Sequence, residues 1–381
     1  MRILFAGNVA NTGYVATKLM RSQGIDAYLL MEKNPPQIYD PLKTDPTLEG
    51  KYPNWILFFD KNERGFIWKF KILRIMRKFD LIQAHYDYCI YAYLSRKPFI
   101  AQEMGDDLRI LAFQNSLRGR LLRRSYKKSK VFLHGGFTAI HLLSKLKIKN
   151  SLFFPLSYDD SFFIPQTFDD DPFKDKFVVF HPTNLWWKKT KDVPITKGND
   201  ILIHGFANFI KKHPNSLLVI VDRGPDVEAT HELINLLGIE KDVIYLKGPL
   251  NSLDLRKYYN LSDVVADQFV LGDIGLIVRE ALSCGKPVIT FYHKDQYQNL
   301  YGDEIPILNA KTSKDIVKQL EYLFDDKVRE NIGELGIDWN KKHHSSKTIS
   351  QKMIILYKEI FCGNNISAIN QKFLVLINNK N

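Results

Sequence analysis

The sequence is poor in cysteine, with three in 381 residues, at positions 89, 284 and 362. These three fit no metal-binding spacing, so we interpret them as reduced thiols of a cytosolic protein. No stretch reaches about 18 uninterrupted apolar residues, so we expect no segment that spans a bilayer. The first residues, MRILFAGN, lack a charged leader followed by a long apolar region. We therefore expect no signal peptide.

What the sequence does have is length and positive charge. A chain of 381 residues, 45% of them hydrophobic, is too long for one ordinary core and predicts two domains of similar size. The net charge is +12, and the first 170 residues supply +10 of it, with 26 Lys and Arg against 16 Asp and Glu. Such a surface attracts phospholipid headgroups, nucleic acid or acidic glycans, although lysine-rich composition alone explains it equally well. Because no helix-turn-helix, zinc or RNP-like pattern accompanies the charge, we predict no nucleic-acid partner.

Strands and helices alternate in both halves of the sequence, which is typical of a parallel, doubly wound sheet. In the first half we predict a helix over 11–23 and strands at 3–7, 27–32, 79–85 and 98–103. In the second half we predict strands at 176–182, 217–222, 243–248, 263–267 and 287–290, with helices over 200–212 and from 275. The acidic, proline-containing segment 159–175 is interpreted as a linker, and a last helix is predicted over 346–361. Ligands of such sheets bind at the carboxyl ends of the strands, so the loops there are the candidate sites.

Three of these loops lie in the first half. Gly7 and Gly13 flank small polar residues between a strand and a helix, where backbone N–H groups can approach an anion, although an ordinary turn explains them as well. His85 follows a strand and is either a site residue or a structural hydrogen-bonding histidine. The loop QEMGDDLR brings Gly105, Asp106 and Asp107 after another strand, either as polar groups at a cleft or as the capped start of a helix.

Two loops in the second half carry stronger signals. Lys197, beside a glycine at a predicted helix start, suits a phosphate. Trp186 and Trp187, in the same loop, either stack on a ring, rest at a membrane interface or are partly buried residues of an exposed insertion. In GDIGLIVREALSCGKPVIT, residues 272–290, the exposed N–H groups at the helix start form an anion site. Glu280 lies about one and a half turns inside this helix and can accept hydrogen bonds from vicinal hydroxyls, unless it is an exposed residue beside Arg279.

The stretch 272–289 resembles the donor-binding pattern E-G-F-G-L-x-x-x-E-A-x-A-x-G-x-P-V-I of the retaining GT-B nucleotide-sugar glycosyltransferases, glycosyltransferase family 4, also called group 1. KGNDILIHGF at 197–206 and LLVIVDRGP at 217–225 agree in order, and the resemblance covers about residues 1–361. It implies an α/β GT-B fold, in which two Rossmann-like doubly wound domains face a central cleft. The expected parts are an acceptor-binding domain (1–165), a donor-binding domain (172–345) and a C-terminal helix and tail (346–381) whose helix crosses back to the first domain.

The resemblance also implies roles for individual residues. Glu280 would bind the donor ribose, Lys197 would neutralise the donor diphosphate, and the backbone amides of Ile274, Gly275 and Leu276 would hold the phosphate and sugar. The further donor-side candidates are Gly7, Gly13, Asn184, Arg223, Gly224, Lys247, Gly248 and Leu250. The candidates on the acceptor or sugar side are His85, Gly105, Asp106 and Asp107. We expect no metal and no cofactor beyond the nucleoside-diphosphate sugar as co-substrate, of UDP or GDP type.

Three positions depart from the family pattern. Gly272 stands where the family has its first glutamate, which contacts the transferred sugar, and the neighbouring Asp273 is a candidate catalytic substitute. Met104 replaces a histidine, and Asn184 replaces an arginine whose charge Lys188, Lys189 or Lys191 could supply. These departures leave two alternatives open, a catalytically inactive subunit that binds a nucleotide or glycan, and a nucleotide-sugar epimerase of the same fold.

The function implied by the resemblance is sugar transfer with retention of configuration, to a saccharide or lipid-linked glycan, in polysaccharide or glycoconjugate synthesis. Two predicted helices of the basic first half, over 68–78 and 117–130, have basic and apolar faces that suit an anionic lipid surface. Solvated faces of packing helices are the alternative. We expect a cytoplasmic protein, with a peripheral position on the cytoplasmic face of the membrane left open.

Overall fold

The computed structural model describes residues 1–63, 65–190 and 196–378. The chain divides into two compact units, of which the first comprises Met1–Tyr158 together with His344–Asn381 and the second comprises Asp159–His343. The predicted linker 159–175 therefore belongs to the second unit. Each unit is described by itself below, and the cleft predicted between two domains stays a prediction.

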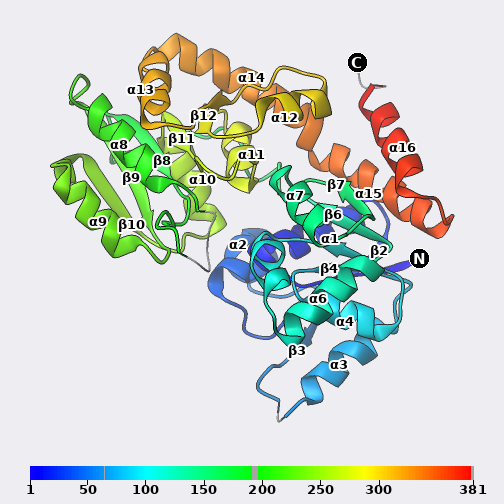
Figure 1. The fold of residues 1–381 in the computed structure, drawn as a ribbon. Coiled ribbons are helices and arrows are strands. Elements are labelled where there is room, and N and C mark those ends of the chain that lie inside the picture. The colour runs from blue at the N-terminus through cyan, green and yellow to red at the C-terminus, as the bar shows by residue number, and fades with distance from the viewer. Residues whose placement is uncertain (64, 191–195, 379–381) are drawn as a thin grey trace. The chain divides into compact units, whose positions relative to one another are not determined.

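The first unit contains a seven-stranded parallel sheet in the order β3-β2-β1-β4-β5-β6-β7 (Figure 1). The direction of winding changes between β1 and β4, which are neighbours in the sheet. Four of the strands were predicted, whereas β3, β6 and β7 were not. The strands are β1 (Arg2–Ala6), β2 (Asp26–Glu32), β3 (Ile56–Phe59), β4 (Leu81–His85), β5 (Phe99–Gln102), β6 (Val131–His134) and β7 (Ser151–Phe153).

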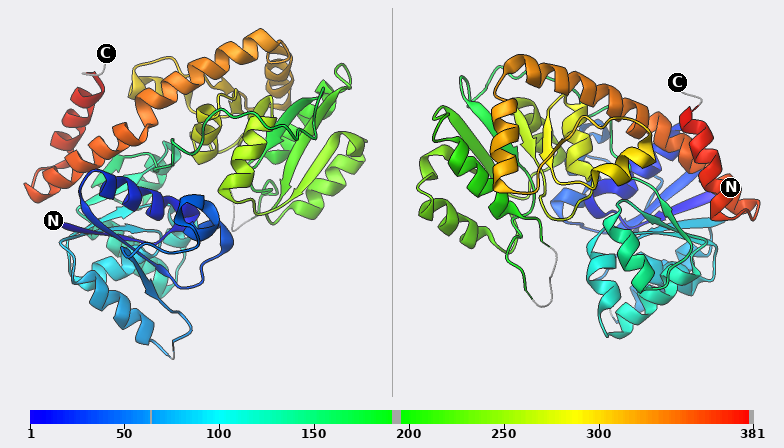
Figure 2. Two further views of the ribbon diagram at one scale, coloured as in Figure 1. Left: turned by 180° about the vertical axis from the view of Figure 1, so that it is seen from behind. Right: turned by 45° about the horizontal axis from the view of Figure 1, so that its top comes forward.

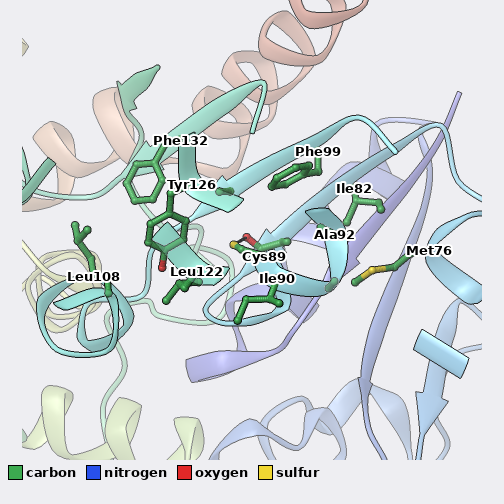
Figure 3. Close-up of a cluster of buried hydrophobic side chains, with 14 of the residues drawn as sticks. Met76, Ile82, Cys89, Ile90, Ala92, Phe99, Leu108, Leu122, Tyr126 and Phe132 are labelled. Atoms are coloured by element: carbon green, nitrogen blue, oxygen red, sulfur yellow. Dashed lines mark hydrogen bonds between the residues drawn. The ribbon is translucent and has the colours of Figure 1, made fainter. Parts of the chain in front are cut away.

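Helices cover both faces of this sheet because both sets of alternate strand side chains are apolar. In β1, Ile3 and Phe5 pack against α1 and α15, whereas Leu4 and Ala6 belong to the core beneath α3, α4, α6 and α7. Figure 2 shows α1 and α3 on opposite sides of the strands, and Figure 3 shows the second core, where Cys89 of α4 and Tyr126 of α6 lie close together. The helices are α1 (Thr12–Ser22), α2 (Pro41–Thr44), α3 (Ile67–Met76), α4 (Tyr88–Ser95), α5 (Asp106–Arg109), α6 (Leu117–Lys128), α7 (Thr138–Lys145), α15 (Ser346–Phe361) and α16 (Ile366–Asn378).

The C-terminal helix returns to the first unit, as predicted. In α15, Ile349, Met353 and Leu356 are buried in the core against β1 and β2, and the Tyr357 hydroxyl donates a 2.6 Å hydrogen bond to Gln83 in β4. The apolar run at 373–377 lies in α16.

The second unit contains a six-stranded parallel sheet in the order β10-β9-β8-β11-β12-β13 (Figure 1). Here the winding changes between β8 and β11, and five of the six strands were predicted. The strands are β8 (Phe177–His181), β9 (Ser216–Asp222), β10 (Val243–Lys247), β11 (Val264–Ala266), β12 (Val288–Thr290) and β13 (Leu308–Asn309). The helices are α8 (Asn199–Phe209), α9 (Val227–Leu236), α10 (Ser252–Leu261), α11 (Leu276–Ser283), α12 (Lys294–Tyr301), α13 (Ser313–Tyr322) and α14 (Asp326–His344).

Among the described residues, no helix is long and apolar enough to cross a membrane. The same residues contain no group of three or more His, Cys, Asp and Glu side chains that could hold a metal ion.

Candidate functional site

The loop that carries Lys197 is fixed to its neighbours by backbone and side-chain hydrogen bonds. The Lys197 N–H donates to the Trp186 carbonyl and the Lys197 carbonyl accepts from Phe269 N–H, both at 2.7 Å. The buried Asn199, at the first position of α8, donates from its amide to Asn184 O at 3.1 Å and to His181 Nε2 at 2.7 Å. These contacts hold Lys197 at the carboxyl end of β8, where the winding of the sheet changes.

A buried carboxylate, Asp267, lies beside Lys197 directly after β11. Its Oδ1 accepts a 2.6 Å hydrogen bond from the Thr183 hydroxyl, and a Cβ atom added to Gly275 would lie 3.5 Å from its Oδ2. Burial raises the pKa of Asp267, and the Lys197 ammonium group and the Thr183 hydrogen bond lower it. Asp267 therefore joins the lysine to the start of α11.

Glu280 lies on α11 within electrostatic reach of the same carboxylate. The hydroxyl of Tyr259, from α10, donates a 2.9 Å hydrogen bond to Glu280 Oε2. Burial raises the pKa of Glu280 to about 7, against the lowering effects of Tyr259 and Arg279, and the negative charge of Asp267 contributes to the rise. Arg279 is itself buried and donates to the Ile274 carbonyl at 2.9 Å. The interpretation of Glu280 as an exposed residue beside Arg279 is therefore wrong.

The start of α11 offers backbone N–H groups to an anion. No side chain caps this helix, and within the described residues the amides of Gly275, Leu276, Ile277 and Val278 have no hydrogen-bond acceptor. Helix N-termini of this kind carry a partial positive charge and bind phosphates. The Ile274 amide differs from these four because it donates to the hydroxyl of the buried Tyr297 at 3.2 Å.

The loop before α11 is shaped by two side chains that sequence analysis did not select. The buried Gln268 accepts from Leu271 N–H at 2.6 Å and donates to the Asp273 carbonyl at 3.0 Å. The Tyr297 hydroxyl approaches Asp273 Oδ1 at 3.3 Å. Asp273, the candidate for the missing glutamate, is therefore tied to α12 through Tyr297.

At position 272, where the family has a glutamate, this chain has a glycine, and a histidine ring from another loop lies beside it. Gly272 has a φ of +77°, in the left-handed region that side chains rarely adopt. A Cβ atom added there would lie 2.6 Å from His293 Nε2, so the imidazole fills the space where a side chain at 272 would begin. Neither ring nitrogen of the half-buried His293 has a hydrogen-bond partner within the described residues. A histidine from the loop after β12 thus supplies a polar group on this side of the site.

The remaining predicted donor residues of the second unit lie at the end of β10 or in the loops after β9 and β10. Arg223 accepts a 2.7 Å hydrogen bond from Leu185 N–H through its carbonyl, and Gly224 lets the chain approach Leu185 closely. Trp187, in the loop after β8, donates from its indole to Thr230 at 3.0 Å, which favours its structural interpretation. Lys188 and Lys189 are exposed, whereas Lys191 lies outside the described residues. Lys247 is the last residue of β10, the outermost strand of this sheet, and Gly248 and Leu250 follow it.

The first-unit candidates Gly7, Gly13 and His85 form one tightly packed corner. A Cβ atom added to Gly13 would lie 2.2 Å from the Gly7 carbonyl oxygen. The buried His85 contacts Gly7 O through Nδ1 and Gln102 Oε1 through Nε2, each at 3.1 Å, and burial lowers its pKa to about 4. This is the arrangement of a structural histidine that stays uncharged at neutral pH.

The candidates after β5 are divided between the core and the surface. Asp107 is fully buried, accepts from Met104 N–H at 2.8 Å and from the Tyr126 hydroxyl at 2.6 Å, and has its pKa raised to about 7, mainly by burial. Gly105 precedes α5, and the exposed Asp106 pairs with Arg109 at 3.4 Å. Asp107 thus fixes the loop before α5 from a position inside the helix. No side chain caps α5, whose N-cap residue is Gly105, so the alternative of an Asp cap is wrong.

Comparisons with known proteins agree with this geometry. Residues 191–339, which lie within the second unit, match the family model "Glycosyl transferases group 1". The alpha-monoglucosyldiacylglycerol synthase of Acholeplasma laidlawii is 25% identical over 169 residues, which are 43% of this chain and 41% of that protein. The chain thus spans less than half the length of this relative.

Solved structures resemble the chain along most of its length. Anabaena HepE, crystallised with UDP and glucose, superposes with a TM-score of 0.71 at 16% identity, over 94% of this chain and 99% of its own. Sucrose-phosphate synthase from Thermosynechococcus elongatus superposes with a TM-score of 0.64 at 13% identity, over 96% and 100% of the two chains. These likenesses, with the two parallel sheets, confirm the predicted GT-B fold class.

Proposed function

We propose that the chain is a retaining glycosyltransferase of family 4, which moves a sugar from a nucleoside-diphosphate sugar to a saccharide or lipid-linked glycan acceptor. Its expected setting is the synthesis of a cell-surface polysaccharide or glycoconjugate. The observation that carries the proposal is the approach of Lys197 and Glu280 to one carboxylate, Asp267, beside the uncapped start of α11. This arrangement lies within the segment that matches the family model.

The proposed chemistry needs a positive environment for a leaving diphosphate. The bond between the anomeric carbon and the diphosphate oxygen breaks, and the negative charge that develops is stabilised by Lys197 and by the N–H groups of Gly275 and Leu276. The acceptor oxygen forms its bond on the same face of the sugar, and its proton passes to the departing phosphate. Glu280 and the Tyr259 hydroxyl hold the ribose hydroxyls.

The acceptor and membrane parts of the proposal rest on the first unit. Three side chains at the start of α3 are strongly exposed, Phe66 at 68%, Ile67 at 60% and Phe70 at 71%, beside Lys69. Exposed apolar groups beside cations suit an anionic bilayer surface. The lipid product in the name of the Acholeplasma relative favours a lipid-linked acceptor. Sedimentation with phosphatidylglycerol vesicles tests this part, and binding that survives Ile67→Glu combined with Phe70→Glu contradicts it.

The experiment that tests the transferase uses the purified full chain with a panel of UDP- and GDP-sugars, with and without acceptor glycans. Without an acceptor, we expect slow hydrolysis of the donor. With the right acceptor, the donor should be consumed faster, and the anomeric NMR signal of the product should show the configuration of the donor. Lys197→Ala should abolish most turnover, whereas Lys211→Ala, beyond the other end of α8, should not. Equal turnover by wild type and Lys197→Ala contradicts the proposal.

A second candidate function is favoured by the replacement of the family glutamate by Gly272, with His293 in the vacant space. In a catalytically inactive subunit, the nucleotide would still bind through α11 and Glu280, but no donor would be consumed. In the same panel, nucleotide binding with complete absence of turnover supports this candidate. Conversion of the donor to an epimer in the absence of any acceptor would instead identify an epimerase.

A further inference from the structure

The first unit contains a cavity of about 280 Å³ that no predicted site residue lines. It lies at the carboxyl ends of β1, β2, β3 and β4, beside the point where the winding of the sheet changes. Its volume is just below the usual range for small-molecule sites, about 300–1,000 Å³. Six of its lining residues are aromatic, and these are Tyr39, Phe59, Trp68, Tyr86, Tyr88 and Tyr91.

The aromatic rings form a connected wall. Phe59 stacks on Trp68 with ring centroids 5.9 Å apart, and it meets Tyr88 edge-on at 6.1 Å. Trp68 and Tyr91 have centroids 6.0 Å apart. Phe59 is buried, but Trp68, Tyr88 and Tyr91 stay partly exposed, so part of their apolar surface is open to an occupant.

The same cavity is also lined by polar groups, and some of their hydrogen-bond donors and acceptors are not used within the part of the chain that the structure describes. Within the described residues, the hydroxyls of Tyr39, Tyr86, Tyr88 and Tyr91 make no hydrogen bond. Burial, followed by the charge of Asp87, raises the pKa of Tyr88 and of Tyr91, so their hydroxyls keep their protons and can donate. Cavities with aromatic walls and a few convergent polar groups are typical ligand sites.

The charges that line the cavity cancel. Glu32 pairs with Lys61, and Asp87 pairs with Arg118, each at 2.5 Å. The carboxylate side chains are less exposed than their cationic partners, at 28% and 24% against 50% and 54%. A phosphate or carboxylate ligand would have to approach these two acids, whereas the hydroxyls of a neutral ligand can donate to their oxygens.

One wall of the cavity is held in an uncommon backbone conformation. Tyr86, directly after β4, has a φ of +55°, in the left-handed region that a bulky side chain rarely occupies. Such conformations persist where the surrounding structure fixes them, and they cluster at ligand sites. Tyr86 N–H is held by the Gln102 carbonyl at 3.3 Å.

We propose that this cavity binds one neutral sugar ring of the acceptor, with the ring's C–H face on the aromatic wall and its hydroxyls on Glu32, Asp87 and the tyrosine hydroxyls. A sugar ring is small, uncharged and rich in hydroxyls, which matches the volume, the charge balance and the unused donors of the cavity. The description of this sugar as the acceptor rests on the proposed transferase function, but the binding of a saccharide here does not.

The test is saturation-transfer NMR on the full-length chain, with methyl glucoside, methyl galactoside and methyl mannoside as neutral probes and glucose 6-phosphate as the anionic probe. At least one neutral glycoside should bind, with a dissociation constant on the order of 1 mM. Octyl glycosides of the same sugars distinguish a lipid-linked ring, which they should mimic with tighter binding, from a free one. Absence of binding by all neutral probes, or tighter binding of glucose 6-phosphate, overturns the proposal.

Two positions on α4 provide a matched pair of variants. Tyr91→Ala removes part of the aromatic wall and should weaken glycoside binding about tenfold, whereas Leu94→Ala, at a residue outside the cavity that is 41% exposed, should not. Circular dichroism checks that both variants fold, and Trp68→Ala replaces Tyr91→Ala if that variant does not. Equal affinity of wild type and the folded cavity variant places the glycoside elsewhere and refutes the site.

Nucleotide binding by the wild-type chain, measured in the same samples, separates the two proposals. Glycoside binding without binding of UDP- or GDP-sugars contradicts the transferase and leaves the saccharide site standing. Binding of a nucleotide sugar without any glycoside binding contradicts the saccharide site and leaves the transferase proposal standing.

Discussion

The ionisation of Glu280 should control how nucleotide affinity varies with pH. The pKa of this carboxyl is raised from 4.5 to about 7, chiefly by burial. Ribose hydroxyls donate to the ionised form, so a nucleotide favours loss of the proton and binds poorly while Glu280 is protonated. With a pKa of about 7, roughly a tenth of the molecules are ionised at pH 6 and about nine tenths at pH 8. Affinity for a nucleotide sugar should therefore rise about tenfold between these two values.

The raised pKa of Glu280 also makes the stability of the folded unit depend on pH. Because the folded-state pKa is raised, the protonated form is favoured, and the ionised carboxylate destabilises the folded unit above pH 7. The contribution of Glu280 to stability is therefore largest below about pH 4.5 and falls as the pH rises to about 7. The full fall is at most about 3 kcal/mol, from roughly 1.4 kcal/mol per unit of pKa. Glu280→Gln should remove this fall and raise the thermal midpoint at pH 8.

The assay is isothermal titration calorimetry with UDP-glucose, whose diphosphate has no ionisation between pH 6 and 8. Wild type should show the tenfold rise, and Glu280→Gln should bind weakly with little dependence on pH. Asp263→Asn is the matched control, because burial also raises the pKa of Asp263, but this carboxylate accepts from Val178 N–H at 2.8 Å at the other end of β11. A flat profile for wild type, or an unchanged rise in Glu280→Gln, would refute the reasoning.

Three further outcomes are expected. Lys197→Ala should lower donor turnover by about a hundredfold or more, corresponding to about 3 kcal/mol of lost charge stabilisation, as measured by steady-state hydrolysis of the donor; a smaller loss than tenfold would contradict its role. Gly272→Glu should not restore the family glutamate, because the positive φ and the His293 ring both oppose a side chain there, and it should lower the thermal midpoint by the equivalent of about 1–3 kcal/mol. The addition of His293→Ala should recover part of that loss, and equal midpoints for the single and double variants would show that the ring is not the obstacle. Tyr357→Phe should destabilise the first unit by about 1 kcal/mol or more, because Gln83 loses a buried donor, and urea unfolding followed by α15 hydrogen exchange would detect it.

The fold could be predicted largely from local patterns. Buried parallel strands read as short apolar runs between turn residues, and nine of the thirteen strands were found in this way. The strands β3, β6, β7 and β13 were missed, and length alone does not explain this, because β5, β11 and β12 are similarly short and were found. The return of the C-terminal helix was implied by the family resemblance, since no local pattern reports which core a helix joins.

The candidate site was predictable only where its residues lie in a recognisable sequence pattern. Lys197 and Glu280 could be selected because they stand at fixed positions relative to a loop and a helix. Asp267 offered a signal that was not used, since it is the last residue of the strand predicted at 263–267 and directly follows the observed β11. Tyr259 and His293 offered none, because a side chain that approaches from another helix or loop is placed by tertiary packing rather than by spacing in the sequence.

The two units place their candidate sites by the same rule, although their chemistry differs. In each parallel sheet the helices before and after the change of winding pass to opposite faces, so the loops there separate and leave room at the carboxyl edge. In the second unit these loops follow β8 and β11, and they carry Lys197 and Asp267. In the first unit they follow β1 and β4, and they line the aromatic cavity through Val9 and Tyr86. The second unit offers cationic and amide groups, which a diphosphate donor would require. The first unit offers aromatic groups and paired charges, which a neutral saccharide would require.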